Sequence, residues 1–97
     1  METYVILRRH GFRDGDDLRA AAERSTIEGE EMSDGVRWIR SYVLAEEDGT
    51  LGTVCIYQAT SPEAVLEHAR RADLPADEVI PSPDTVIVRP DPEPVPA

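Results

Sequence analysis

Hydrophobic and polar residues alternate in three segments of the chain, and this pattern is typical of β-strands that bury one face. The segments are Tyr4–Arg8, Val36–Val43 and Gly52–Tyr57, and a fourth segment rich in β-branched residues follows at Thr85–Arg89. Successive side chains of a strand point to opposite faces of a sheet. The sequence therefore predicts four strands, each with two chemically different sides.

Two helices are predicted between these strands. The first runs from about Asp17 to Met32 and follows an acidic turn that suits a helix start. The second runs from Pro62 to about Ala72, with Ser61 as its N-cap. The order β-α-β-β-α-β predicts an α+β fold of the ferredoxin-like type, a four-stranded antiparallel sheet with both helices on one face.

The two faces of this sheet differ in chemistry. The aliphatic set is expected beneath the helices and consists of Val5, Leu7, Ile39, Val43, Val54, Ile56, Val86 and Val88. The aromatic and polar set is expected on the uncovered face and consists of Tyr4, Ile6, Arg8, His10, Trp38, Arg40, Tyr42, Cys55, Tyr57 and Ile87. An uncovered face with so many large apolar groups is costly in water. We therefore predict a homodimer whose sheets face each other, as in a dimeric α+β barrel.

Composition narrows the possible partners. The net charge is −10, which argues against binding to nucleic acid or to an anionic membrane surface. No apolar run reaches the length of a signal-peptide core or a membrane span, so a cytoplasmic location is expected. Residues 1–89 are expected to form one domain. Residues 90–97 contain four prolines and are expected to form an extended or disordered tail.

His68 is the first candidate for chemistry. It lies among the alanine and valine residues on the apolar side of the second predicted helix. A neutral imidazole there can be a metal ligand or a general base. The alternative is a histidine at the edge of the core that bonds to a backbone carbonyl.

Cys55 and His10 are two further candidates for a metal site. The Cys55 thiolate would be a soft ligand for nickel, zinc or copper, although a lone buried cysteine is often an apolar filler. His10 ends the first strand, where it could join a metal site, bind an anion or be a solvated loop residue. The acidic run Glu46–Asp48 is expected to be solvated surface.

Aromatic and arginine side chains suggest a ligand pocket on the uncovered face. Trp38, Tyr42 and Tyr57 could form its walls, with Arg8 and Arg40 as anion-binding groups. The same residue types are enriched at protein interfaces, so a dimer contact explains them equally well.

Four motifs resemble a known family. They are Trp38-Ile-Arg-Ser-Tyr-Val43, Cys55-Ile-Tyr57-x-Ala59, Pro62-Glu-x-x-x-Glu-His68-Ala69 and Leu74-Pro75-Ala76. In this order they resemble a family of small actinobacterial nickel-binding proteins, formerly a domain of unknown function. The resemblance implies a ferredoxin-like subunit, a dimeric α+β barrel and nickel binding, and it makes His68 the first position to carry over.

Two functional hypotheses follow. In the first, a homodimer binds nickel or another divalent metal through His68, Cys55 or His10. In the second, the protein is a cofactor-independent enzyme of the dimeric α+β barrel type, such as a monooxygenase, isomerase or cyclase. His68 would then act as base on a small organic molecule, in a pocket lined by Arg40, Tyr42 and Tyr57. A plain interaction module is a third possibility.

Overall fold

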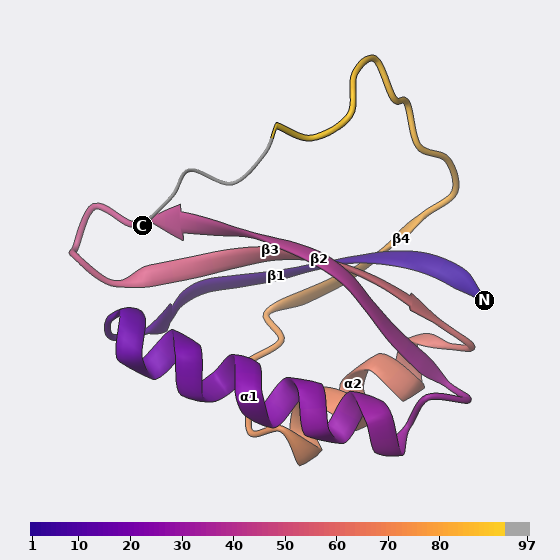
Figure 1. Cartoon of the computed structure of the whole chain (residues 1–97), viewed down its shortest axis with the longest axis horizontal. Helices are drawn as coiled ribbons and strands as arrows, with labels where there is room; N and C mark the ends of the chain where they lie inside the picture. Colours follow the sequence, from indigo (N-terminus) through magenta and orange to yellow (C-terminus); the bar gives the residue numbers. More distant parts are fainter. Residues whose placement is uncertain (93–97) are drawn as a thin grey trace.

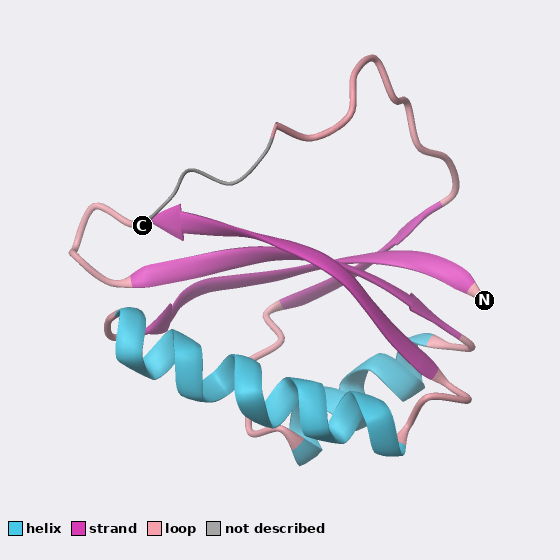
Figure 2. Cartoon of the chain, in the orientation of Figure 1, coloured by secondary structure: helices cyan, strands magenta, loops and turns pink. Residues whose placement is uncertain are grey.

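The structure is a computed structural model that describes residues 1–92. In this range the chain forms β1 (Glu2–Phe12), α1 (Gly15–Glu31), β2 (Val36–Ala45), β3 (Leu51–Ala59), α2 (Pro62–Arg71) and β4 (Glu78–Ser82) (Figure 1). The strands pair antiparallel in the order β2-β3-β1-β4. Both helices lie on one side of the sheet (Figure 2). The predicted ferredoxin-like α+β fold is confirmed.

Local chemistry at the chain reversals explains the helix boundaries. The side chain of Asp14 caps α1 by accepting a 2.9 Å hydrogen bond from the backbone N–H of Asp17. Ser61 caps α2 in the same way, and Pro62 follows at the first helical position. Gly49 has a φ of 87°, as the hairpin between β2 and β3 requires.

The helices cover the face of the sheet opposite to the one predicted. Six side chains of β1 and β3 lie beneath them, each at most 5% exposed. These are Tyr4, Ile6, Arg8, Thr53, Cys55 and Tyr57. Val5 and Ile56, from the set that was expected beneath the helices, lie on the uncovered face. The prediction of which face is covered is therefore wrong, although the division of these two strands into two sets of side chains is correct.

Side-chain volume gives the physical reason for this reversal. The buried positions of α1 are Ala21 and Ser25, and Ala69 is among those of α2. Helices with such small residues leave room beneath them for large side chains from the sheet. Tyrosine and arginine fill this space better than valine would, because protein interiors pack at close to crystal density.

A bulge in β2 separates side chains that were predicted to share one face. The pairing with β3 shifts between Trp38, which pairs with Tyr57, and Arg40, which pairs with Ile56. A bulge of this kind moves the following side chains to the opposite face. Trp38 therefore lies on the helix side, whereas Arg40 and Tyr42 lie on the uncovered face.

The fourth strand lies at Glu78–Ser82, so the prediction of a strand at Thr85–Arg89 is wrong. The backbone N–H of Asp77 donates to the carbonyl of Leu7 at 3.1 Å, so the loop that follows α2 reaches β1 just before Glu78. Pro81 is tolerated because β4 is an edge strand. Val86, Ile87 and Val88 are consequently 76–88% exposed instead of lying in the sheet.

The segment after β4 arches over the uncovered face (Figure 1). Its Asp91 carboxylate forms an ion pair with Arg40 and accepts a 2.7 Å hydrogen bond from the Tyr42 hydroxyl. Of the tail predicted for residues 90–97, residues 93–97 lie outside the described residues. Neither helix within residues 1–92 has the length and apolarity needed to cross a bilayer.

Candidate functional site

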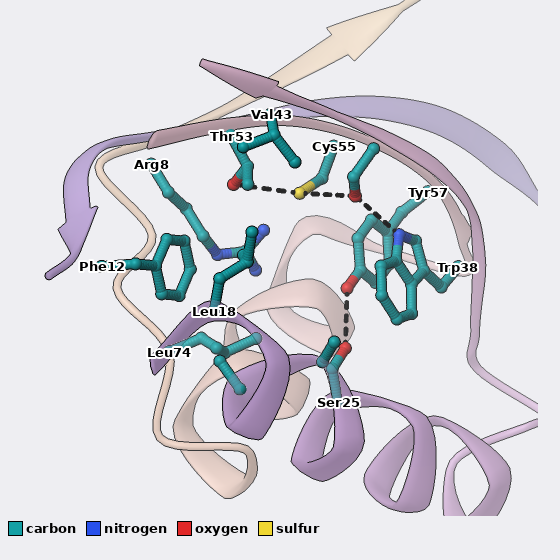
Figure 3. A pocket seen from close by; sticks show the side chains of 13 residues that line it. Arg8, Phe12, Leu18, Ser25, Trp38, Val43, Thr53, Cys55, Tyr57 and Leu74 are labelled. Carbon is teal, nitrogen blue, oxygen red and sulfur yellow. Dashed lines mark hydrogen bonds between the residues drawn. The ribbon is translucent and has the colours of Figure 1, made fainter. Parts of the chain in front are cut away.

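A cavity of about 260 Å³ lies between α1 and the sheet (Figure 3). Its walls are mostly apolar and come from β1, β2, β3, α1 and the segment after α2. It opens beside the edge strand β2, where Trp38 and Val43 line it and are 38% and 53% exposed. This cavity lies under the helices, whereas the sequence predicted a pocket on the uncovered face.

Among the described residues that line the cavity, Arg8 is the only one with a charged side chain. The residue is 1% exposed, and its guanidinium points into the space between the sheet and α1 (Figure 3). Its Nε donates a 2.6 Å hydrogen bond to the carbonyl of Pro75. Its Nη2 is buried and has no hydrogen-bond partner among the described residues. Arg8 therefore places a positive charge inside the protein with no anionic partner among the described residues.

Tyr57 links the cavity to α1. Its hydroxyl lies 3.1 Å from that of Ser25, and its ring stacks on Trp38 with centroids 6.3 Å apart. The Arg8 guanidinium carbon lies 5.9 Å from the centroid of the Tyr57 ring, within the range of a cation–π contact. Burial raises the pKa of Tyr57, so its hydroxyl stays protonated at neutral pH.

A chain of hydroxyl groups holds the Cys55 thiol in place (Figure 3). Trp38 Nε1 donates to Ser41 Oγ at 2.8 Å, and this hydroxyl donates to Cys55 Sγ at 3.0 Å. The thiol in turn donates to the Thr53 hydroxyl at 3.3 Å. Cys55 is 5% exposed and both of its hydrogen-bonding neighbours are neutral hydroxyls. The structure therefore places the thiol within a hydrogen-bonded series of neutral groups.

His68 is completely buried, on the apolar side of α2 as predicted. Its Nε2 lies 3.0 Å from the carbonyl of Ser25, so Nε2 carries the proton and donates it. Nδ1 is buried without a partner among the described residues. Burial lowers the pKa of His68. The histidine bonded to a backbone carbonyl is thus the arrangement observed, and His68 does not line the cavity.

His10 lies near the C-terminal end of β1, in a bulge opposite Gly52. The bulge gives His10 a φ of 54°, and Glu46 accepts a 2.8 Å hydrogen bond from its backbone N–H. The ring Nδ1 lies 3.0 Å from a carboxylate oxygen of Asp48. The bulge interrupts the alternation of β1 at His10, so strand parity does not place its side chain, and the ring contacts Asp48 and Thr50 of the β2–β3 hairpin.

The carboxylates beside His10 are more than solvated surface. Hydrogen bonds from the Arg9 guanidinium lower the pKa of Glu46 to about 2. Hydrogen bonds from the hydroxyl and the backbone N–H of Thr50 lower the pKa of Asp48 to about 2. The expectation that Glu46–Asp48 is solvated surface is wrong for Glu46, whose side chain is 4% exposed, whereas Glu47 and Asp48 are exposed. The 38 positions between His10 and Asp48 hid their contact from sequence reasoning.

The other candidate residues do not converge on one site. Of the four proposed catalytic residues, Tyr57 alone lines the cavity, while Arg40 and Tyr42 lie on the uncovered face with Asp91. Sequence reasoning missed Ser25 and Ser41, which order Tyr57 and Cys55. Neither serine belongs to a distinctive motif, although Ser25 is one of the two buried positions of α1.

The donors that the structure describes do not form a nickel site within one chain. Residues 1–92 contain no group of three or more His, Cys, Asp or Glu side chains placed to hold a metal ion. His68 has one free ring nitrogen in a closed interior, and Cys55 is bonded to hydroxyls. His10 and Asp48 are the exposed pair of donors, so a complete site there would need water or a second chain for its remaining ligands.

Comparison with known proteins agrees with the fold. The crystal structure of SCO4226 from Streptomyces coelicolor A3(2) superposes with a TM-score of 0.67 at 22% identity, over 87% of this chain and 99% of that chain. The chain matches none of the curated proteins. A profile of the family described as "Nickel responsive protein SCO4226-like" matches residues 4–81. The match includes both helices and the whole sheet apart from its outermost residues. The chain therefore belongs to the SCO4226-like family of nickel responsive proteins.

Proposed function

We propose that this protein binds Ni²⁺ or a similar divalent cation as a cytoplasmic homodimer. Its membership of a family described as nickel responsive supports the choice of metal. The net charge of −10 favours the approach of cations. The single structural observation that carries the proposal is the exposed pair formed by the His10 imidazole and the Asp48 carboxylate.

The surroundings of His10 suit a metal ligand. The His10 side chain is half exposed, and its Nδ1 and Nε2 lie 3.0 Å and 3.5 Å from carboxylate oxygens of Asp48 and Glu46. Imidazole nitrogen and carboxylate oxygen are suitable donors for divalent transition metals. Both carboxylates are ionised at any pH near neutrality because their pKa values are about 2. Asp48 and the His10 ring can thus bind a metal ion without the free-energy cost of removing a proton from a carboxyl group.

The homodimer would pack through the uncovered face of the sheet. This face carries Val5, Val54 and Ile56, together with the exposed ring of Tyr42. Val86, Ile87 and Val88 add three exposed apolar side chains in the segment that arches over this face. A second copy is the occupant that we propose, because the same apolar surface is present on both chains and a two-fold contact is self-complementary.

Isothermal titration with NiCl₂ tests the metal proposal. Wild-type protein is expected to show a saturable heat of binding. His10→Ala is expected to weaken binding by about 10-fold or more, because it removes one direct ligand of the metal. His68→Gln is the matched control, because it changes the other histidine and preserves a donor near Ser25. Its nickel affinity is expected to match that of the wild type.

Two results would overturn this proposal. The absence of a saturable heat of binding with the wild type would exclude nickel binding by this protein. Loss of binding in His68→Gln with normal binding in His10→Ala would move the metal to the buried histidine, the position suggested first by the sequence.

The structure gives little support to the alternative of a cofactor-independent enzyme. That hypothesis needs His68 and Tyr42 in one pocket, but His68 lies under the helices and Tyr42 on the uncovered face. The cavity beneath the helices holds no histidine and no carboxylate among its lining residues in the described chain. A general base at the cavity wall is thus absent from residues 1–92.

A further inference from the structure

We propose that the cavity under α1 binds a small, largely apolar carboxylate, with Arg8 as the anion-binding group. The proposal goes beyond nickel binding, because none of the metal candidates except Cys55 lines this cavity. It depends on three observations: the charge of Arg8 without an anionic partner among the described residues, the apolar walls and the volume of the cavity.

The charge of Arg8 calls for an anion. A guanidinium stays protonated in proteins, so burial cannot be relieved by loss of a proton. None of the described residues that line the cavity is acidic, and the Pro75 carbonyl takes only the Nε hydrogen. A buried charge without an anionic partner is costly, and an oxyanion that accepts a hydrogen bond from the guanidinium would reduce that cost. The Arg8 guanidinium is therefore the group that we assign to ligand recognition.

The walls specify the rest of the ligand. Phe12, Leu18, Val43 and Leu74 surround the guanidinium with hydrocarbon (Figure 3). At about 260 Å³ the cavity lies just below the range of roughly 300–1,000 Å³ that is common for drug-sized ligands. Free phosphate or sulfate would leave these apolar walls uncovered. A carboxylate attached to one ring or to a short branched chain satisfies both the charge and the walls.

The cavity is also accessible and open to direct observation. Trp38 lines it at the edge strand and is the only tryptophan of the chain. Its indole N–H belongs to the hydrogen-bonded series that ends at Thr53 on the cavity wall. A ligand that enters beside β2 must pass this ring, so Trp38 fluorescence should report binding.

The test is titration of the full chain with sodium benzoate, followed by Trp38 fluorescence and by calorimetry. Benzyl alcohol is the neutral probe of similar size, and sodium phosphate and sodium chloride at equal ionic strength are the inorganic probes. Saturable binding of benzoate is expected, with binding of the other three at least about 10-fold weaker. A response to phosphate or chloride as strong as that to benzoate would overturn the choice of an apolar carboxylate.

Variants separate the cavity from the rest of the surface. Arg8→Met should weaken benzoate binding by about 10- to 100-fold, whereas Arg40→Met, the same change on the uncovered face, should leave it unchanged. Ala22→Phe keeps Arg8 but fills the cavity, so it should also abolish binding and serves as the test if Arg8→Met does not fold. Benzoate binding of wild-type strength in either cavity variant, or no saturable binding by the wild type, would overturn the proposal.

Discussion

The Nε2 atom of His68 lies 3.0 Å from the carbonyl oxygen of Ser25, and this contact joins α2 to α1 inside the core. It fixes the tautomer of the ring, because a carbonyl can only accept the hydrogen bond. The same contact places a titratable group where protonation is costly. Nδ1 would have to take up a proton in a closed interior, with the Arg8 charge acting against it.

This contact predicts a pH dependence of stability. Burial lowers the pKa of His68 in the folded state from its ordinary value of 6.5. The unfolded chain therefore binds more protons just below pH 6.5, and the free energy of unfolding should fall as the pH drops through this region. We expect His68→Gln to lose this part of the dependence. Urea unfolding of both proteins between pH 5 and 8 measures it, and equal slopes would contradict the assignment.

The hydrogen bond between Tyr57 and Ser25 predicts a second effect on stability. Tyr57→Phe leaves the buried Ser25 hydroxyl without a partner, which should lower the free energy of unfolding by about 1–2 kcal/mol. Ser25→Ala should cost a similar amount. The double variant is the control, and it should cost clearly less than the sum because both partners are then removed. Strict additivity in chemical denaturation would show that the bond contributes nothing.

Gly52 allows β1 and β3 to approach each other closely beside His10. A Cβ at this position would lie 2.7 Å from the backbone carbonyl oxygen of Arg8 and 3.0 Å from a carboxylate oxygen of Glu46. Gly52→Ala should therefore lower stability by about 1–3 kcal/mol, the usual range for overpacking. Gly15→Ala is the matched control, since its new Cβ would lie 3.9 Å from the nearest atom, at the end of Arg19. Thermal melting should show a clear decrease for the first variant only.

The proposed dimer predicts an effect of charge on the uncovered face. Ile56→Asp places a carboxylate at the centre of that face and should convert the dimer to a monomer. Ile27→Asp makes the same change at a residue of α1 that is 58% exposed, and should leave the dimer intact. Light scattering after size-exclusion chromatography gives the masses. A wild-type monomer at micromolar concentration would exclude the dimer, and so would a dimer that persists in Ile56→Asp.

Much of this fold follows from local patterns in the sequence. Ser61-Pro62 defines the start of α2, Asp48-Gly49 defines the hairpin, and the alternation in β1 and β3 sorts their side chains into two correct sets. The burial of His68 follows from helical periodicity, since Val65 and Ala69 share its side of α2. Each of these features depends on residues close together in the chain, so the sequence displays it directly.

Other features depend on contacts between distant segments. The strand at Glu78–Ser82 forms because the connection from α2 reaches β1 there, although Thr85–Arg89 has the stronger strand composition. The bulge in β2 places the side chains of Trp38 and Arg40 on opposite faces of the sheet, and no residue type in the segment predicts this bulge. The contact of His10 with Asp48 spans 38 positions and depends on a second bulge.

The sequence by itself determined the order of the elements, the class of the fold and the two sets of side chains on each regular strand, because short-range periodicity and capping control these. The tertiary structure alone decided which set the helices cover. Packing volume makes that choice: helix faces of alanine and serine leave room for tyrosine and arginine. The same packing leaves the cavity under α1. It encloses Arg8 in the cavity wall without an anionic partner among the described residues.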